Sequence, residues 1–359
     1  MPVKSRRSTL ATVAASAGVS VATVSKVLNS RSDVAPSTRA LVQSVLQEQG
    51  YLPASPRRGE AASRPTIEVT FDGDLHAYSA EILQGVLDGG AEVGVAVVVS
   101  IRSDGRSGVP AARPTAWARD LASAGRRAVI AVTSELTSAH LTALAREHLP
   151  LVVIDSLNLP RTRVTSIGST NFAGGLAATQ HLLALGHRRI AYVGGPASAA
   201  CNQARMHGFR AAMESGGAPV PKAYVRTGQF VFQDGVAGGA AVLDLPQPPT
   251  AVFAGSDEVA LGVIEAARAR GLRIPEDLSI VGFDDVQIAS MASPPLTTVR
   301  QPLREMGGVA VRTALRLAAG EKVDSYHVEL ATELVVRGST APLEGGLEGR
   351  AQPDPVEAP

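Results

Sequence analysis

The strongest constraint in this sequence is the alternation of short β-rich runs with amphipathic helical segments between residues 66 and 341. Such alternation is typical of a parallel sheet that carries helices on both faces. The expected strands fall into two series, at residues 67–71, 95–101, 128–132 and 151–154, and at 190–193, 250–254 and 279–283. The two series predict an α/β body of two doubly wound parallel-sheet lobes.

Helices are expected between these strands, at residues 79–91, 173–185, 205–214 and 259–270. Gly186 and Gly271 follow two of them and are predicted to end those helices, because glycine readily adopts the left-handed conformation found there.

The chain is expected to cross between the lobes near residues 168–171 and again near 294–295, before a strand-like segment at 297–301 and a helix at 303–319. We therefore predict a first lobe of residues 66–168 and 296–323, a second lobe of residues 169–295 and 324–341, and a flexible tail at 342–359.

Apolar runs in the chain are strand length, and the basic start at Lys4 and Arg6 is not followed by an apolar stretch. We therefore expect neither a membrane span nor a secretory signal, and we expect the protein in the cytoplasm. The single cysteine, Cys201, cannot form an internal disulfide and is interpreted as a small buried or loop residue. No cofactor and no metal site are expected.

The positive charge is concentrated at one end of the chain. The net charge is +1, but residues 1–64 hold nine basic and three acidic side chains, so that the remainder carries a net charge of −5. A basic patch of this kind favours a phosphate backbone, although a solvated basic face has the same charge.

A pair of short helices is expected in this basic region. Residues 9–17 have apolar side chains at helical spacing, Gly18 interrupts the pattern, and Ser20 is a suitable N-cap for a second helix at 21–29. A third helix is expected from Pro36 to about residue 49. Two helices joined by a glycine turn predict a small all-α helix-turn-helix domain, whose second helix enters the DNA major groove.

This region resembles the N-terminal signature of the lactose repressor (LacI/GalR) family. The matching stretches are Thr9-Leu10, Val13-Ala14, Ala17-Gly18-Val19-Ser20, Thr23-Val24-Ser25-Lys26-Val27-Leu28-Asn29 and Gly50-Tyr51-Leu52-Pro53. The resemblance implies that residues 1–53 bind DNA, with Val21, Ala22 and Lys26 at base edges and Ser20, Thr23, Ser25 and Asn29 at phosphates, together with Leu10. Taken singly, Thr23 and Ser25 would also serve to cap or solvate the helix.

Residues 54–65 are predicted to be a linker, and here the chain departs from the family. Many members continue with a hinge helix whose leucine enters the minor groove, whereas Glu60 aligns with that leucine, and Pro56 and Gly59 disfavour a helix. Two interpretations of Arg57 and Arg58 stay open: an arm attracted by a narrow minor groove, or incidental charges on a plain linker.

Carboxylates recur just after the predicted strands of the body, at Asp72, Glu135, Asp155, Asp257 and Asp284. Ligands of open α/β sheets bind beyond these strand ends, and acidic side chains suit a polyol such as a sugar. Each carboxylate alone would also serve as a helix N-cap, which is the commoner role.

The body resembles the same family in residues 185–191, 254–262, 271–279 and 295–301, which implies a periplasmic-binding-protein-like fold. By this resemblance the effector-binding positions are Arg205, Asp155, Asp284 and either Ser256 or Asp257, with the aromatic side chains Tyr78 and Phe230. Trp117 is interpreted as core, and the cluster of His187, Arg188 and Arg189 as solvated loop charge without a ligand role.

The resemblance implies a homodimeric repressor that binds double-stranded operator DNA and is released by a small molecule, a monosaccharide or an oligosaccharide. A purine or other corepressor stays open as the effector, as does a sugar-binding protein without a DNA role. An enzyme is disfavoured, since the sequence has no Gly-rich phosphate loop and no metal-spaced His/Cys cluster. No leucine heptads follow Pro342, so nothing supports a C-terminal tetramer bundle.

Overall fold

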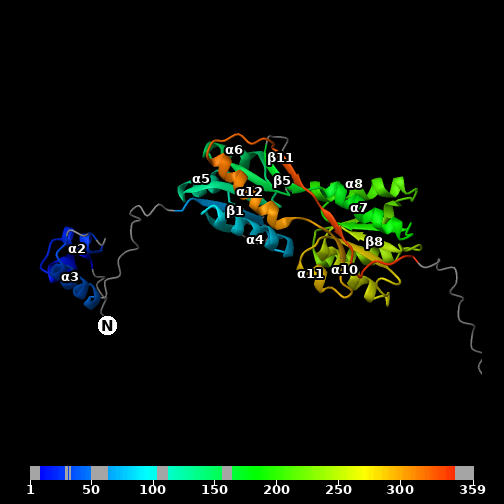
Figure 1. Cartoon of the computed structure of the whole chain (residues 1–359), viewed down its shortest axis with the longest axis horizontal. Helices are drawn as coiled ribbons and strands as arrows, with labels where there is room; N and C mark the ends of the chain where they lie inside the picture. Colours follow the sequence, from blue (N-terminus) through cyan, green and yellow to red (C-terminus); the bar gives the residue numbers. More distant parts are fainter. Residues whose placement is uncertain are drawn as a thin grey trace, which may run out of the picture. The chain divides into compact units, whose positions relative to one another are not determined.

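A computed structural model describes residues 9–28, 31, 34–49, 64–102, 112–155 and 164–343. The chain divides into two compact units, residues 1–63 and residues 64–359, which are described separately (Figure 1). Asn29, Arg57 and Arg58, and with them most of the predicted linker, lie outside the described residues.

The first unit consists of α1 (Leu10–Ser16), α2 (Val21–Leu28) and α3 (Pro36–Glu48), which confirms the three predicted helices. Thr9 begins α1 with a capping box in which its side chain and that of Thr12 each accept a backbone amide of the other. Gly18 has a φ of +63° in the turn between α1 and α2, a conformation that glycine adopts without strain. The small core is made of Val13, Ala14, Ala17, Val24, Val27, Val42 and Val45.

The second unit contains two six-stranded sheets with helices on both faces, as predicted. The first lobe comprises β1 (Thr66–Asp72), α4 (Ala77–Glu92), β2 (Ala96–Arg102), α5 (Pro114–Ser123), β3 (Arg126–Val132), α6 (Ser138–Arg146), β4 (Leu151–Ile154), β5 (Thr165–Ser169), α12 (Leu303–Ala318) and β11 (His327–Leu330). Its strand order is β11-β5-β4-β3-β1-β2, and all five neighbouring pairs are parallel.

The second lobe comprises α7 (Asn171–Ala184), β6 (Ile190–Gly194), α8 (Ala200–Ser215), a 3-10 turn (Lys222–Tyr224), β7 (Val225–Thr227), α9 (Phe232–Leu243), β8 (Ala251–Ala254), α10 (Asp257–Arg268), β9 (Ser279–Asp284), α11 (Gln287–Met291), β10 (Thr297–Arg300) and β12 (Glu333–Val335). Its strand order is β12-β10-β9-β8-β6-β7, and only the β12–β10 pair is antiparallel.

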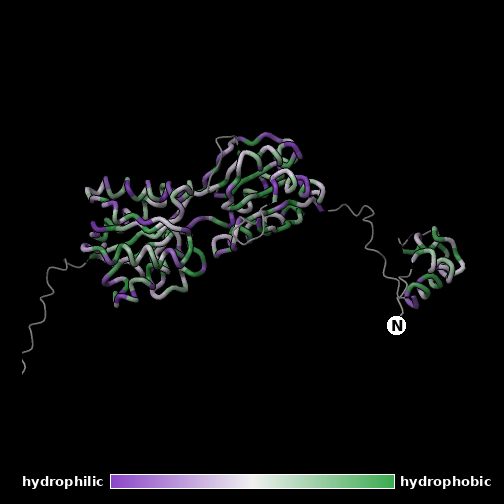
Figure 2. The backbone as a smooth tube through the Cα atoms, turned by 180° about the vertical axis from the view of Figure 1, so that it is seen from behind, coloured by the Kyte–Doolittle hydropathy of each residue, from purple (hydrophilic) through white to green (hydrophobic). Residues whose placement is uncertain are grey.

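Alternating side chains of each sheet fill two cores. In β3, Ile130 and Val132 pack with α4 and α12 on one face, while Val129 packs with α5 and α6 on the other. In the second lobe, α9 and α10 cover one face and α7 and α8 the other. Figure 2 shows hydrophobic stretches running through the interior of the lobes and hydrophilic ones on their outer turns.

The predicted lobe boundaries need correction at two elements. Residues 296–323 were expected in the first lobe, yet β10 pairs in parallel with β9 of the second lobe, with Thr297 opposite Val281. Residues 324–341 were expected in the second lobe, yet β11 pairs with β5 of the first. The chain therefore crosses at residues 170, 301–302 and 331–332, and in Figure 1 the orange α12 lies among the cyan elements of the first lobe.

Two local expectations also need correction. His187 is buried, not solvated, because its ring contacts the hydroxyls of Thr250 and Ser279 at 3.0 and 3.1 Å. The predicted tail begins later than expected, since the Leu343 amide donates to the Leu185 carbonyl at 2.8 Å. Residues 344–359 lie outside the described part.

No single helix in the described ranges is long and apolar enough to cross a membrane. Only α1 and α2 taken together are long and apolar enough, and the two helices are bent by 105° at the break between them.

Three helix pairs cross at facing glycines, namely α4 with α12, α7 with α8 and α9 with α10. A Cβ on Gly175 of α7 would lie 2.3 Å from the Arg205 carbonyl oxygen, and one on Gly208 of α8 would lie 2.2 Å from the Phe172 carbonyl oxygen. Gly85 with Gly307 and Gly235 with Gly262 meet in the same way. Because the obstacles are backbone atoms, they cannot move aside, and only glycine permits these close helix contacts.

We therefore predict that Gly208→Ala lowers stability, although alanine is the better helix former by about 1 kcal/mol. Overpacking of about 1–3 kcal/mol should lower the calorimetric Tm by several degrees. Gly308→Ala on α12 is the matched control, because its Cβ would meet the end of the flexible Arg312 side chain at 3.3 Å and the Gly85 carbonyl oxygen at an ordinary van der Waals distance of 3.9 Å. Equal melting of Gly208→Ala and wild type would contradict the packing argument.

Candidate functional site

The helix α2 presents the face that the sequence assigned to DNA. Val21, Ala22 and Lys26 are exposed, while Val24 and Val27 are buried in the core. An exposed valine and alanine at the start of a short helix offer apolar contact to a partner, and Lys26 adds a charged donor one turn later. Their contact with base edges stays a prediction.

The remaining predicted DNA contacts have local roles as well. The Ser20 hydroxyl accepts the Thr23 amide at 3.1 Å and contacts the Thr23 hydroxyl at 2.9 Å, so Ser20 caps α2. Ser25 is half-buried, and Leu10 packs against the core of the unit. Ser20 and Thr23 therefore stabilise the start of α2 whether or not they also meet a phosphate.

The second unit has a cavity of about 1770 Å³ that is lined by both lobes. Tyr78 and Asp155 of the first lobe and Arg205, Phe230, Ser256 and Asp284 of the second all line it. Six of the seven predicted effector residues are thus brought together at the carboxyl ends of the strands, as expected for an open α/β sheet.

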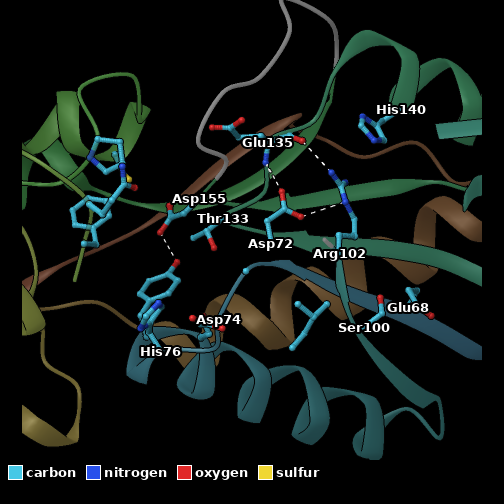
Figure 3. Close-up of a pocket in the computed structure, with 18 of the residues that line it drawn as sticks. Glu68, Asp72, Asp74, His76, Ser100, Arg102, Thr133, Glu135, His140 and Asp155 are labelled. Carbon is cyan, nitrogen blue, oxygen red and sulfur yellow. Dashed lines mark hydrogen bonds and ion pairs between the residues drawn. The ribbon is translucent and has the colours of Figure 1, made fainter. Parts of the chain in front are cut away.

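The first-lobe wall is centred on Asp155, which follows β4. Its carboxylate accepts a hydrogen bond of 2.6 Å from the Tyr78 hydroxyl at the start of α4 (Figure 3). Burial raises the pKa of Asp155, and burial together with the Asp155 charge raises the pKa of Tyr78. At neutral pH the tyrosine therefore remains a donor that holds the carboxylate in place.

The second-lobe wall is centred on the guanidinium of Arg205, which is 3% exposed. Its Nε donates to Asn171 Oδ1 at 2.7 Å, and its Nη1 donates to the Gly255 carbonyl at 2.6 Å. The guanidinium also lies 3.8 Å from the centre of the Phe283 ring and 5.5 Å from that of Phe230. These contacts fix its plane beside the cavity.

Asp284 lies next to this arginine at the end of β9. Its Oδ1 is 3.7 Å from Arg205 Nη1 and accepts a hydrogen bond of 2.6 Å from Gln301. Burial raises the pKa of Asp284 to about 7, a shift that Arg205 and Gln301 offset only in part. The carboxyl therefore changes charge near neutral pH while facing the cavity.

Of the two alternatives Ser256 and Asp257, only Ser256 lines the cavity, and its contact with an effector stays a prediction. Asp257 is fully buried, and its carboxylate accepts hydrogen bonds from the Thr298 hydroxyl at 2.5 Å and the Val286 amide at 3.0 Å. Through these two hydrogen bonds Asp257 holds the neighbouring strand ends together without lining the cavity. Ser256 lines the cavity and also caps α10 by accepting the Val259 amide.

Backbone strain is concentrated at these strand ends. Thr133, Asp155, Asp284 and Asp285 have φ values of +45°, +43°, +120° and +57°, which non-glycine residues rarely adopt. Such strain costs about 1–3 kcal/mol at each residue and clusters at functional sites. The folded state therefore holds the two pocket aspartates in positions that the local chain disfavours.

Several residues in or next to the cavity lining were not foreseen. Asn171 and Gln301 sit at the lobe crossings and bond to Arg205 and Asp284, which no sequence pattern signalled. Trp117 is half-buried and packs against the core between α5 and α6, as expected, but it also lines the cavity, which was not expected. The buried Cys201 also lines the cavity. Among the described residues, no group of three His, Cys, Asp or Glu side chains is arranged to hold a metal.

The two lobes also contact each other directly beside the cavity. Glu258 at the start of α10 accepts the Ala77 amide of α4 at 3.3 Å and lies 3.5 Å from His76 Nδ1. In addition, Val286 of the second lobe is buried in the core of the first. These contacts depend on the relative position of the lobes and would change if that position changed.

The raised pKa of Asp284 predicts a pH dependence of stability. Because a free aspartate titrates near 3.8, the folded state binds the extra proton between about pH 4 and 7. The contribution of this carboxyl is fully present at acid pH and is lost as the pH rises through about 7. We expect wild type to lose Tm relative to Asp284→Asn between pH 5 and pH 8 in calorimetry, whereas a pH-independent difference would contradict the raised pKa.

Comparison with known proteins bears on both units. Residues 9–54 match the family model described as bacterial regulatory proteins, lacI family, and residues 179–340 match a periplasmic binding protein-like domain. The HTH-type transcriptional regulator DegA of Bacillus subtilis (strain 168) is 33% identical over 342 residues, covering 94% of this chain and 99% of DegA.

Two solved structures are also similar over the whole length. The complex of the transcriptional regulator CelR with cellobiose has a TM-score of 0.69 at 31% identity and covers 93% of this chain and 100% of that chain. The lac repressor dimer bound to operator and the anti-inducer ONPF has a TM-score of 0.69 at 29% identity, covering 94% and 100%. The chain belongs to the lacI family of bacterial regulatory proteins.

Proposed function

We propose that this protein is a sequence-specific transcriptional repressor of carbohydrate-utilisation genes, controlled by a sugar in the cavity between its lobes. One observation carries the proposal: a chain of this family places a buried arginine, two strained aspartates and an aromatic ring around one interlobe cavity. Carboxylates accept hydrogen bonds from sugar hydroxyls, the guanidinium donates to them, and the Phe230 face packs on a sugar ring.

DNA recognition is assigned to α2, with Val21, Ala22 and Lys26 at base edges. Operators of helix-turn-helix proteins are read by two copies with two-fold symmetry, so we propose that the protein acts as a homodimer in the cytoplasm. The edge strand β2 supports a dimer, because Val99 and Ile101 are 40% and 57% exposed there.

Effector control requires that the sugar favours one relative position of the lobes. Tyr78 and Asp155 of the first lobe and Arg205 of the second lie on opposite walls of the cavity, and the Glu258 contact with α4 joins the lobes beside it. A ligand that bonds to both walls changes the balance between lobe positions, and a coupling of about 1–3 kcal/mol alters DNA affinity roughly 5- to 150-fold.

The test uses the full-length protein and an operator selected from random duplex DNA. Fluorescence anisotropy is measured with and without a panel of pentoses, hexoses, disaccharides and purines. Release of the operator by a sugar supports the proposal. Tightening by a purine supports a corepressor-dependent regulator, and the absence of specific DNA binding contradicts a repressor.

We predict that Lys26→Ala weakens binding to the selected operator by about 1–3 kcal/mol and reduces the preference over random DNA. Lys222→Ala is the charge-matched control, since Lys222 is an exposed residue of the other unit. Equal losses on operator and random DNA would assign Lys26 to a phosphate instead of a base.

We predict that Arg205→Ala retains operator binding but loses the response to sugar. Arg205→Lys should also lose most of it, because lysine keeps the charge but cannot donate to Asn171 and Gly255 from one planar group. Arg210→Ala on the exposed face of α8 is the control, and circular dichroism checks the fold. A normal sugar response in both Arg205 variants would remove this residue from the pocket.

A further inference from the structure

A polar patch lies on the first-lobe side of the cavity, away from Arg205. It consists of Thr70 and Asp72 of β1 and of Ser100 and Arg102 of β2, and we refer to it as the β1–β2 patch. Asp72, Ser100 and Arg102 line the cavity, and Thr70 is fully buried beside them. The register pairs Thr70 with Ser100 and Asp72 with Arg102, so the four side chains share one face of the sheet. Figure 3 shows Asp72, Ser100 and Arg102 beside one another.

This patch is unusual for a parallel sheet, whose two faces are normally apolar. In β1, Ile67, Val69 and Phe71 face the core, and the alternate side chains Thr70 and Asp72 face the patch. The face of the sheet that carries the patch is therefore polar at this position, whereas a face covered by helices would be apolar.

The hydrogen bonding of the patch is incomplete. In the described part of the chain five buried side-chain polar atoms have no hydrogen-bond partner, and four of them belong to the patch. They are Thr70 Oγ1, Asp72 Oδ1, Ser100 Oγ and Arg102 Nη1. Asp72 Oδ1 has an ion-pair partner in Arg102, so three of the four lack any partner. Because a buried polar group without a partner costs about 1–3 kcal/mol, three neighbouring ones indicate a site whose partner comes from outside the chain.

The other atoms of Asp72 and Arg102 are held in place. Asp72 Oδ2 accepts the Glu135 amide at 2.9 Å, and Arg102 donates to the Glu135 carbonyl at 3.2 Å. Asp72 Oδ1 lies 3.3 Å from Arg102 Nε as an ion pair. Arg102 Nη1, which has no hydrogen-bond partner, is therefore fixed in position before any ligand arrives.

An aromatic ring completes this end of the cavity. Trp117 of α5 lines it, with the Arg102 guanidinium 5.2 Å from its ring centre and the His140 ring edge-on at 5.8 Å. A fixed ring beside mixed donors and acceptors is the arrangement that binds a sugar ring by its apolar face and its hydroxyls.

The patch and the Asp155 site belong to strands that are not neighbours in the sheet. Strands β4, β3, β1 and β2 are successive neighbours, so three strand spacings of about 4.8 Å place the backbones of Asp155 and Arg102 roughly 14 Å apart, further than one sugar ring spans. The same cavity includes both positions.

We propose that the cavity takes a disaccharide or longer oligosaccharide, whose inner ring lies beside Arg205 and Asp155 and whose outer ring binds the β1–β2 patch against Trp117. This inference rests on the function proposed above. The outer ring is uncharged, because Asp72 and Glu68 border the site and Arg102 is already paired with Asp72. Hydroxyls both donate and accept, which matches the unpaired oxygens and nitrogen.

The test uses full-length protein and two readouts. Trp117 is the only tryptophan of the chain, so its emission reports occupancy of the outer position directly. Glucose, galactose and xylose are compared with cellobiose, maltose, lactose and xylobiose, and operator release is measured by anisotropy. We expect at least one disaccharide to change the Trp117 emission and to bind roughly tenfold or more tightly than its component monosaccharides.

We expect Arg102→Ala to weaken that disaccharide roughly 10- to 150-fold, the range for a hydrogen bond to a charged group, with monosaccharide affinity within twofold of wild type. Arg119→Ala on the exposed face of α5 is the control. Ser100→Ala is a second variant, chosen because it should still fold. It removes a buried hydroxyl that has no hydrogen-bond partner, so Tm should not fall, and disaccharide affinity should fall roughly 2- to 10-fold.

The outcomes separate the two proposals. If monosaccharides bind as tightly as every disaccharide, or if Arg102→Ala and Ser100→Ala leave disaccharide affinity unchanged, the outer position is wrong while sugar control of the operator stands. If no sugar of either size releases the operator or changes the emission, both proposals are wrong.

Discussion

The buried guanidinium of Arg205 is the charge on which the pocket depends. Removing such a charge from water costs several kcal/mol unless it is hydrogen-bonded and paired, and here Asn171 and Gly255 accept its hydrogen bonds and Asp284 lies 3.7 Å away as its ion-pair partner. Its position follows from backbone packing, because Gly175 of α7 permits the close approach of the Arg205 carbonyl. The glycine contact between α7 and α8 therefore determines where the Arg205 guanidinium lies.

Much of the fold could be predicted from the sequence because hydrophobic periodicity reports burial directly. All seven predicted strands were found, since runs such as residues 128–132 are buried on both faces. The strands that were missed, β5, β7, β11 and β12, are short or contain serine, glycine and charged residues. The prediction of lobe membership was wrong for β10 and β11, because membership depends on which strands pair with each other. Strand pairing leaves no local pattern in the sequence.

The candidate site was predictable where strand ends and the family resemblance pointed to the same residue. Neither source distinguished Ser256 from Asp257, because the two are adjacent and only three-dimensional packing turns Asp257 toward Thr298 and Val286. Trp117 has the helical spacing of a core residue and packs against the core between α5 and α6, but the spacing gave no sign that it also lines the cavity. The buried His187 was missed for the converse reason, since two arginines beside it suggest a solvated loop.

A short path of hydrogen bonds joins the pocket to the lobe crossings. Asp284 accepts from Gln301, and the Gln301 side-chain oxygen accepts from the Ser169 hydroxyl at 2.5 Å. Gln301 lies at the second crossing and Ser169 at the first, while Thr170 and Thr332 bond to each other at 2.9 Å and tie the first crossing to the third.

These crossings are the segments that must bend when the lobes move. Since burial raises the pKa of Asp284 to about 7, its charge responds readily to any ligand that donates to it or displaces Arg205 from it. A change at Asp284 alters the acceptor that orients Gln301, and Gln301 is held by Ser169 across the hinge. In the function proposed above Asp284 contacts the effector, and it lies two hydrogen bonds from the first lobe crossing, so that function requires no long pathway between the pocket and the crossings.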